Sequence, residues 1–177
     1  MMKKKEFSVP FSGLKQGKHE FDYVVNNEFF ESFEYTDFND AKLNLHVLLN
    51  KTSTMLEFEL AADGVVNVDC DITSEPYEQS LVTSLELVVK FGDEYNDESD
   101  EILIVPHGEH QVNIAQYVYE MIVLAVPQKR IHPGVLDGSL DSEALKKLEE
   151  LQPRERKNNS KDTDPRWDAL KKLITDK

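Results

Sequence analysis

The chain has 177 residues, of which 40% are hydrophobic, and its 20 Lys and Arg against 34 Asp and Glu give a formal net charge of −14. This composition excludes a mainly disordered chain, and the length suits one domain with an appendage better than two full domains. The single cysteine excludes an internal disulfide, and neither a membrane-spanning run nor the apolar region of a signal peptide is present, so we expect a cytoplasmic protein.

Six segments have the apolar pattern of β-strands. Their apolar residues alternate with polar ones or run together over a short stretch. The segments are residues 19–25, 42–50, 54–60, 65–72, 80–91 and 101–106. The Asp63-Gly64 pair predicts a hairpin turn between the third and the fourth. Because no long crossover helix separates the strands, the sequence predicts an α+β fold with a mainly antiparallel sheet or a partly closed barrel.

The most apolar helical pattern covers residues 114–126. Asn113 is a candidate N-cap, and Gln116 stands where a capping box would place it. The expected buried face has Leu124 at its border, and Pro127 ends the helix. We therefore expect one central helix packed on the sheet.

Two further helical patterns are shorter. Phe29 and Phe30 follow a candidate N-cap at Asn26 or Asn27. Near the other end, residues 141–152 carry a stripe of leucines at helical spacing and stop before a proline.

The last part of the chain has the pattern of a polar linker followed by a short helix. Residues 152–163 are polar and charged, as in a linker. DPRWDALKKL follows, with Asp164 as N-cap, Pro165 at the first helical position and Trp167 beginning a narrow apolar stripe. A helix this short is marginal alone, so its stripe needs a surface on this protein or on a partner. The sequence thus predicts a body over 1–135 and a helical C-terminal arm over 136–177.

The charges divide unevenly along the chain. Residues 1–128 hold eight Lys and Arg and twenty-four Asp and Glu, whereas residues 129–177 hold twelve and ten. Because nucleic-acid binders present basic surfaces to phosphates, any RNA contact is expected on the later segment or on the three lysines near the start. The acidic body better suits basic protein partners.

Sequence motifs that would indicate a metal site or a catalytic group are weak. His107 and His110 stand three apart around Gly108, but two ligands are too few for a metal site, and a turn is the simpler interpretation. Cys70 lies on the inward side of a predicted strand between two aspartates, whose charge is expected to raise its pKa, so we interpret it as structural. No phosphate loop or nucleophile motif is present. We therefore expect no enzyme activity, cofactor or metal.

Three stretches together resemble the YceD family of proteins linked to accumulation of large-subunit ribosomal RNA. They are ADGVVNVDCDITSEPY (62–77), VNIAQYVYEMIVLAVPQKRIHPG (112–134) and the opening of the last helix, DPRWDALKKL. The resemblance spans roughly residues 60–174. Many members carry cysteine pairs where this chain has Thr73 and the Ile131-to-Gly134 stretch, so a zinc role does not carry over.

The resemblance implies a non-enzymatic factor in large ribosomal subunit biogenesis. It would contact precursor ribosomal RNA, a basic ribosomal protein or an assembly factor, and the alternative is an acidic protein-interaction adaptor without direct RNA contact. The candidate RNA or partner contacts are Lys129, Arg130, His132, Arg154, Arg156, Lys157, Lys161, Arg166, Trp167, Lys171 and Lys172.

Overall fold

A computed structural model describes residues 6–99 and 102–151. The described residues belong to two compact units, 6–140 and 141–151. In chain order the elements are β1 (Ser8–Pro10), β2 (Gly17–Asn26), α1 (Asn27–Glu31), β3 (Asp40–Lys51), β4 (Met55–Asp69), β5 (Pro76–Gly92), β6 (Ile102–Pro106), β7 (Gln111–Asn113), α2 (Ala115–Ala125), α3 (Pro133–Leu136) and α4 (Glu143–Leu151).

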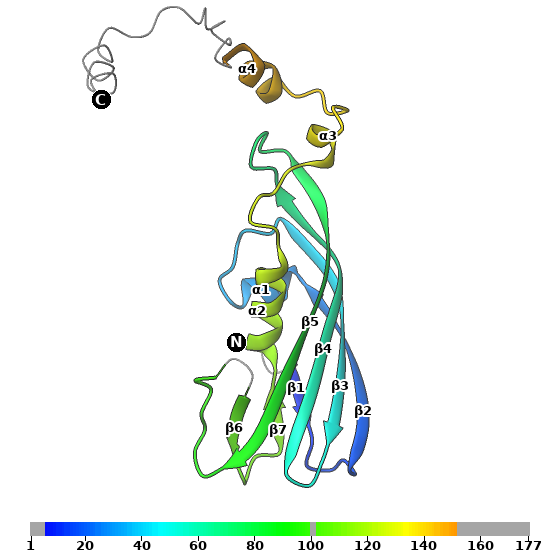
Figure 1. Cartoon of the computed structure of the whole chain (residues 1–177), viewed down its shortest axis with the longest axis vertical. Helices are drawn as coiled ribbons and strands as arrows, with labels where there is room; N and C mark the ends of the chain where they lie inside the picture. Colours follow the sequence, from blue (N-terminus) through cyan, green and yellow to red (C-terminus); the bar gives the residue numbers. More distant parts are fainter. Residues whose placement is uncertain (1–5, 100–101, 152–177) are drawn as a thin grey trace, which may run out of the picture. The chain divides into compact units, whose positions relative to one another are not determined.

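A twisted five-stranded sheet in the order β2-β3-β4-β5-β6 dominates the first unit (Figure 1). The pairs from β2 to β5 are antiparallel, as the sequence predicted, but β5 and β6 are parallel. β2 and β6 are the edges, so over the described residues the sheet does not close into a barrel. β1 and β7 form a separate antiparallel ribbon.

One face of the sheet carries the core. Every second residue of β3 from Ala41 to Leu49 is buried, and the same alternation continues through most of β4. α1 and α2 lie on one side of the sheet (Figure 1), where Phe29, Phe30, Val118 and Ile122 are fully or almost fully buried. Period-two strands thus bury their apolar side under two helices.

The predicted turn at Asp63-Gly64 is wrong. β4 continues through both residues and pairs with β3 and β5 along its length. A Cβ on Gly64 would lie 2.3 Å from the carbonyl oxygen of Lys42, and φ is +154°. The glycine therefore allows a neighbouring backbone to approach closely within a continuous strand. In the sequence such a glycine cannot be told from one that forms a turn.

The helix starts match the predictions in part. Asn26 stands at the N-cap of α1, as predicted, but its side chain makes no capping hydrogen bond. At α2, Asn113 Oδ1 accepts from the Ala115 N–H at 3.0 Å, but Gln116 donates to Glu120 at 2.6 Å and does not reach back as a capping box requires. Leu124 is 83% exposed, because it lies beyond the border of the buried face.

The second unit is described only as far as α4. No residue of α4 is buried, and its Leu148 and Leu151 are 45% and 79% exposed. Lys146 forms an ion pair with Asp141 at 2.7 Å near the start of the helix. The predicted linker 152–163 and the DPRWDALKKL helix lie outside the described residues.

Candidate functional site: the β4–β5 turn and residues 129–132

A short turn joins the two longest strands of the sheet. The Cys70 N–H donates to the Glu75 carbonyl at 2.9 Å, and the Ser74 N–H donates to the Cys70 carbonyl at 2.8 Å. Ser74 has φ of +58°, which closes the turn. β4 and β5 hold both ends of the turn in register, since Asp69 pairs with Pro76.

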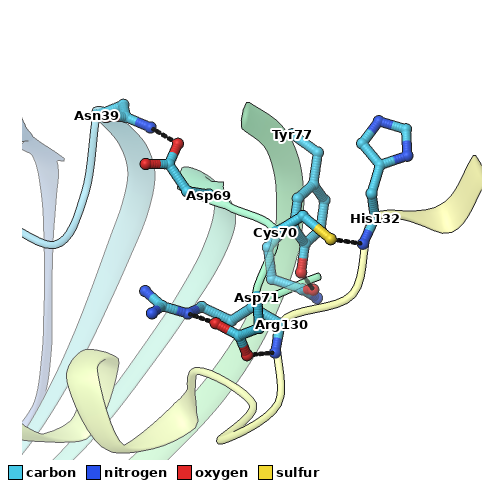
Figure 2. Close-up of polar contacts among 8 residues, drawn as sticks. Asn39, Asp69, Cys70, Asp71, Tyr77, Arg130 and His132 are labelled. Carbon is cyan, nitrogen blue, oxygen red and sulfur yellow. Dashed lines mark hydrogen bonds and ion pairs between the residues drawn. The ribbon is translucent and has the colours of Figure 1, made fainter. Parts of the chain in front are cut away.

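The segment that follows α2 docks against this turn through Asp71 (Figure 2). The Asp71 N–H donates to the Arg130 carbonyl at 2.8 Å, and the Arg130 N–H donates to Asp71 Oδ2 at 2.7 Å. Arg130 Nε also lies 3.4 Å from Asp71 Oδ1. One carboxylate thus fixes both the backbone and the side chain of a residue 59 positions later.

Cys70 lies next to these contacts and is 2% exposed. Its Sγ accepts from the His132 N–H at 3.3 Å (Figure 2). Burial disfavours the thiolate, but hydrogen bonds from His132, Thr73 and Ile72 outweigh it, and the pKa of Cys70 lies below its usual value. The expected burial is confirmed, but the pKa shifts in the direction opposite to the expected rise, because the hydrogen bonds to the sulfur outweigh the effect of burial.

His132 is held on two sides. Its Nδ1 accepts from the Gly134 N–H at 2.9 Å at the start of α3, which places the proton of the neutral ring on Nε2. Its ring meets Tyr77 edge-on at a centroid distance of 5.5 Å. Burial, then the charges of Cys70 and Asp71, raise the pKa of Tyr77. The ring of His132 therefore organises the chain where it enters α3.

A second polar contact lies at the end of β4. Asn39 Nδ2 donates to Asp69 Oδ1 at 2.7 Å (Figure 2). It also donates to Asn67 Oδ1 at 3.2 Å, and so ties the start of β3 to β4. Neither Asn39 nor Asp71 was among the residues that the sequence analysis selected. Both act through contacts with residues far along the chain, which no local pattern reveals.

Three of the predicted contact residues lie within the part of the chain that the structure describes. Lys129 is exposed, Arg130 is engaged by Asp71 with its side chain 28% exposed, and His132 is half-buried. The other predicted contacts lie outside the described residues: Arg154, Arg156, Lys157, Lys161, Arg166, Trp167, Lys171 and Lys172.

The histidines of the PHGEH stretch lie elsewhere. His107 and His110 are exposed, and a turn forms where the Glu109 N–H donates to the Pro106 carbonyl at 3.0 Å. Over residues 6–99 and 102–151, no group of three or more His, Cys, Asp or Glu is placed to hold a metal ion. No described helix is long and apolar enough to cross a membrane.

A comparison with models of protein families shows which family this chain belongs to. The model of the family described as "Large ribosomal RNA subunit accumulation protein YceD" matches residues 58–174, about two thirds of the chain. The chain belongs to the YceD family. The match agrees with the resemblance seen in the sequence over residues 60–174. Neither the curated proteins nor the solved structures contain a match to this chain.

The YceD match covers both parts of the candidate site. It includes most of β4, the Cys70–Asp71 turn, α2 and residues 129–132, whereas β1 to β3 precede it. The family description associates YceD proteins with large-subunit ribosomal RNA and names no reaction.

Proposed function

We propose that this YceD protein is a non-enzymatic, cytoplasmic factor in large ribosomal subunit biogenesis. It would support accumulation of large-subunit ribosomal RNA by contacting precursor RNA, ribosomal proteins or both. The family match carries this proposal. The polar groups of the Cys70–Asp71 turn are directed at one another and fix the chain, which supports a structural role for the turn rather than catalysis.

The charge distribution supports a division of roles. The body before residue 129 has three times as many acidic as basic residues, which repels phosphate. Among residues 129–132, Lys129 is exposed, whereas Arg130 is already paired with Asp71. The proposed RNA contacts therefore concentrate on Lys129 and on the basic residues of the arm over 136–177, with Trp167 as its anchor.

Crosslinking in cells tests the RNA contact. The tagged full chain is crosslinked and the bound RNA is sequenced, beside a chain lacking residues 153–177. We expect crosslinks in precursor large-subunit RNA that disappear with the deletion. Trp167→Ala separates anchoring from charge, since it leaves every cation in place. If that variant folds normally and associates with pre-ribosomal particles at the wild-type level, the anchor role is wrong.

The acidic body favours one other function, a protein-interaction adaptor without RNA contact. Salt separates the two, because binding through phosphates weakens steeply as salt rises. If RNA is absent from the crosslinks while ribosomal proteins still co-purify, the adaptor replaces the RNA-binding factor.

A further inference from the structure

The face of the sheet opposite the core is uncovered in the unit formed by residues 6–140. α2 packs on the core side, where Thr83 Oγ1 donates to the Met121 carbonyl at 3.4 Å. The alternate residues of β2 and β5 point the other way, and two of them, Val24 and Val82, are 66% and 84% exposed. This outer face therefore presents apolar side chains to solvent as well as charged ones.

A shallow groove of about 280 Å³ crosses the outer face over β3, β4 and β5. Leu48 and Val88 supply its apolar part. The carboxylates of Glu57, Glu59 and Glu86 stand around them. One cation, Lys18 of the edge strand, also lines the groove, leaving an excess of negative charge.

Two of these carboxylates lie where their charges destabilise the fold. Glu59 and Glu86 are directly opposite each other on β4 and β5. Like charges in that position are destabilising. Among the described residues neither carboxylate has an ion-pair partner, and the polar neighbour Asn50 donates to Glu57 instead, at 2.6 Å.

We propose that this groove is the docking site for an extended, lysine- or arginine-bearing segment of a partner protein. A cation placed between Glu59 and Glu86 would remove their repulsion, and the apolar stem of its side chain would lie on Leu48 and Val88. The same charges repel nucleic acid. The inference rests on the proposed function only in that large-subunit assembly supplies the basic protein partner.

Binding of a defined peptide tests the proposal on the full chain. The probe is a fluorescein-labelled peptide of alternating lysine and valine, followed by anisotropy at constant salt, and a glutamate-valine peptide controls for the label and the valines. The site variant is Glu59→Gln with Glu86→Gln. The matched variant is Asp93→Asn with Glu94→Gln in the exposed acidic loop, which changes the net charge equally.

We expect the site variant to weaken lysine-valine binding roughly three- to tenfold and the loop variant less than about twofold. Equal weakening by both variants, or none by the site variant, would overturn the proposal, since binding would then follow net charge or lie elsewhere. Both variants keep the fold's buried residues, and the site variant relieves a repulsion, so loss of folding is not expected to obscure the result.

Two other occupants of the groove are tested in the same preparations. If the site variant alters the resonances of residues 152–177 in the peptide-free chain, the groove holds the chain's own basic tail. If it changes the sedimentation coefficient, the groove holds a second copy. Either result overturns the proposal. RNA crosslinking reports separately on the proposed function, so peptide docking without crosslinked ribosomal RNA leaves the groove supported and the direct RNA contact refuted.

Discussion

Replacement of Gly64 by alanine should strongly destabilise the sheet, although the residue is far from any candidate contact. The added Cβ would lie 2.3 Å from the Lys42 carbonyl oxygen and 2.6 Å from Leu43 Cα. Both are backbone atoms of the neighbouring strand, held by pairing on either side, so neither can move without disturbing the β3–β4 ladder.

The expected cost has two parts. An L-residue held at φ of +154° is strained, which costs about 1–3 kcal/mol, and overpacking costs about 1–3 kcal/mol more. Together they lower the free energy of unfolding by about 2–6 kcal/mol. For a chain of this size each kcal/mol lowers Tm by about 2–4 °C, so the loss is well within measurement.

Substitutions at two other glycines separate the cost of backbone strain from the cost of overpacking. Gly17 has φ of +122°, but a Cβ added there would meet nothing within 4 Å, so Gly17→Ala should cost only the strain. Gly13 has neither a positive φ nor a neighbour within 4 Å, so Gly13→Ala should stay within about 1 kcal/mol of wild type. Urea unfolding followed by far-UV circular dichroism ranks the three. A Gly64→Ala variant as stable as Gly13→Ala would refute the close approach of β3 and β4.

Three further predictions concern polar contacts. His46 Nδ1 donates a hydrogen bond to Asp22 Oδ1 at 2.8 Å, and this bond raises the pKa of His46, so Asp22→Asn should lower that pKa in an NMR titration. The stability from this pair is fully present below the unfolded-state pKa of about 6.5 and is lost as pH rises through the higher folded-state pKa; equal wild-type and Asp22→Asn unfolding profiles from acid to neutral pH would contradict it. Asp71→Asn should lower the free energy of unfolding by about 1–3 kcal/mol and speed amide exchange at Arg130, because a charged acceptor is lost. Unchanged exchange would show that residues 129–132 dock without this carboxylate. Cys70→Val should lower the free energy of unfolding, measured in urea, by about 1–2 kcal/mol, since the His132 N–H loses its acceptor. An unchanged free energy of unfolding would mean that water replaces the sulfur as acceptor.

The main strands could be predicted from the sequence because alternation is a local property. The pattern Leu43, Leu45, Val47, Leu49 has period two, and those four residues are buried in β3. The central parts of β2 and β5, and the two ends of β4 on either side of the wrongly predicted turn, were found for the same reason. The Asp63-Gly64 prediction failed because a glycine required by a neighbouring backbone and a glycine required by a turn look the same along one strand.

The candidate site was only partly visible from the sequence. Lys129, Arg130 and His132 were selected as candidate contacts, and the structure shows that Asp71 and Cys70 hold the segment that contains them. The partner Asp71 lies 59 residues earlier, and its adjacency to Cys70 suggested a raised thiol pKa. The backbone donors that reverse this shift come from a tight turn and from His132, and no spacing rule places them next to the sulfur.

By itself the sequence determined the α+β class, most strand positions, the YceD relationship and the concentration of acidic residues before residue 129. Each follows from local periodicity, composition or a contiguous motif. Only the tertiary structure decided that β6 runs parallel to β5, that Asp71 engages Arg130, and that Glu59 and Glu86 face each other on an uncovered surface. These features depend on strand order and register, which are fixed by contacts between residues distant in the chain.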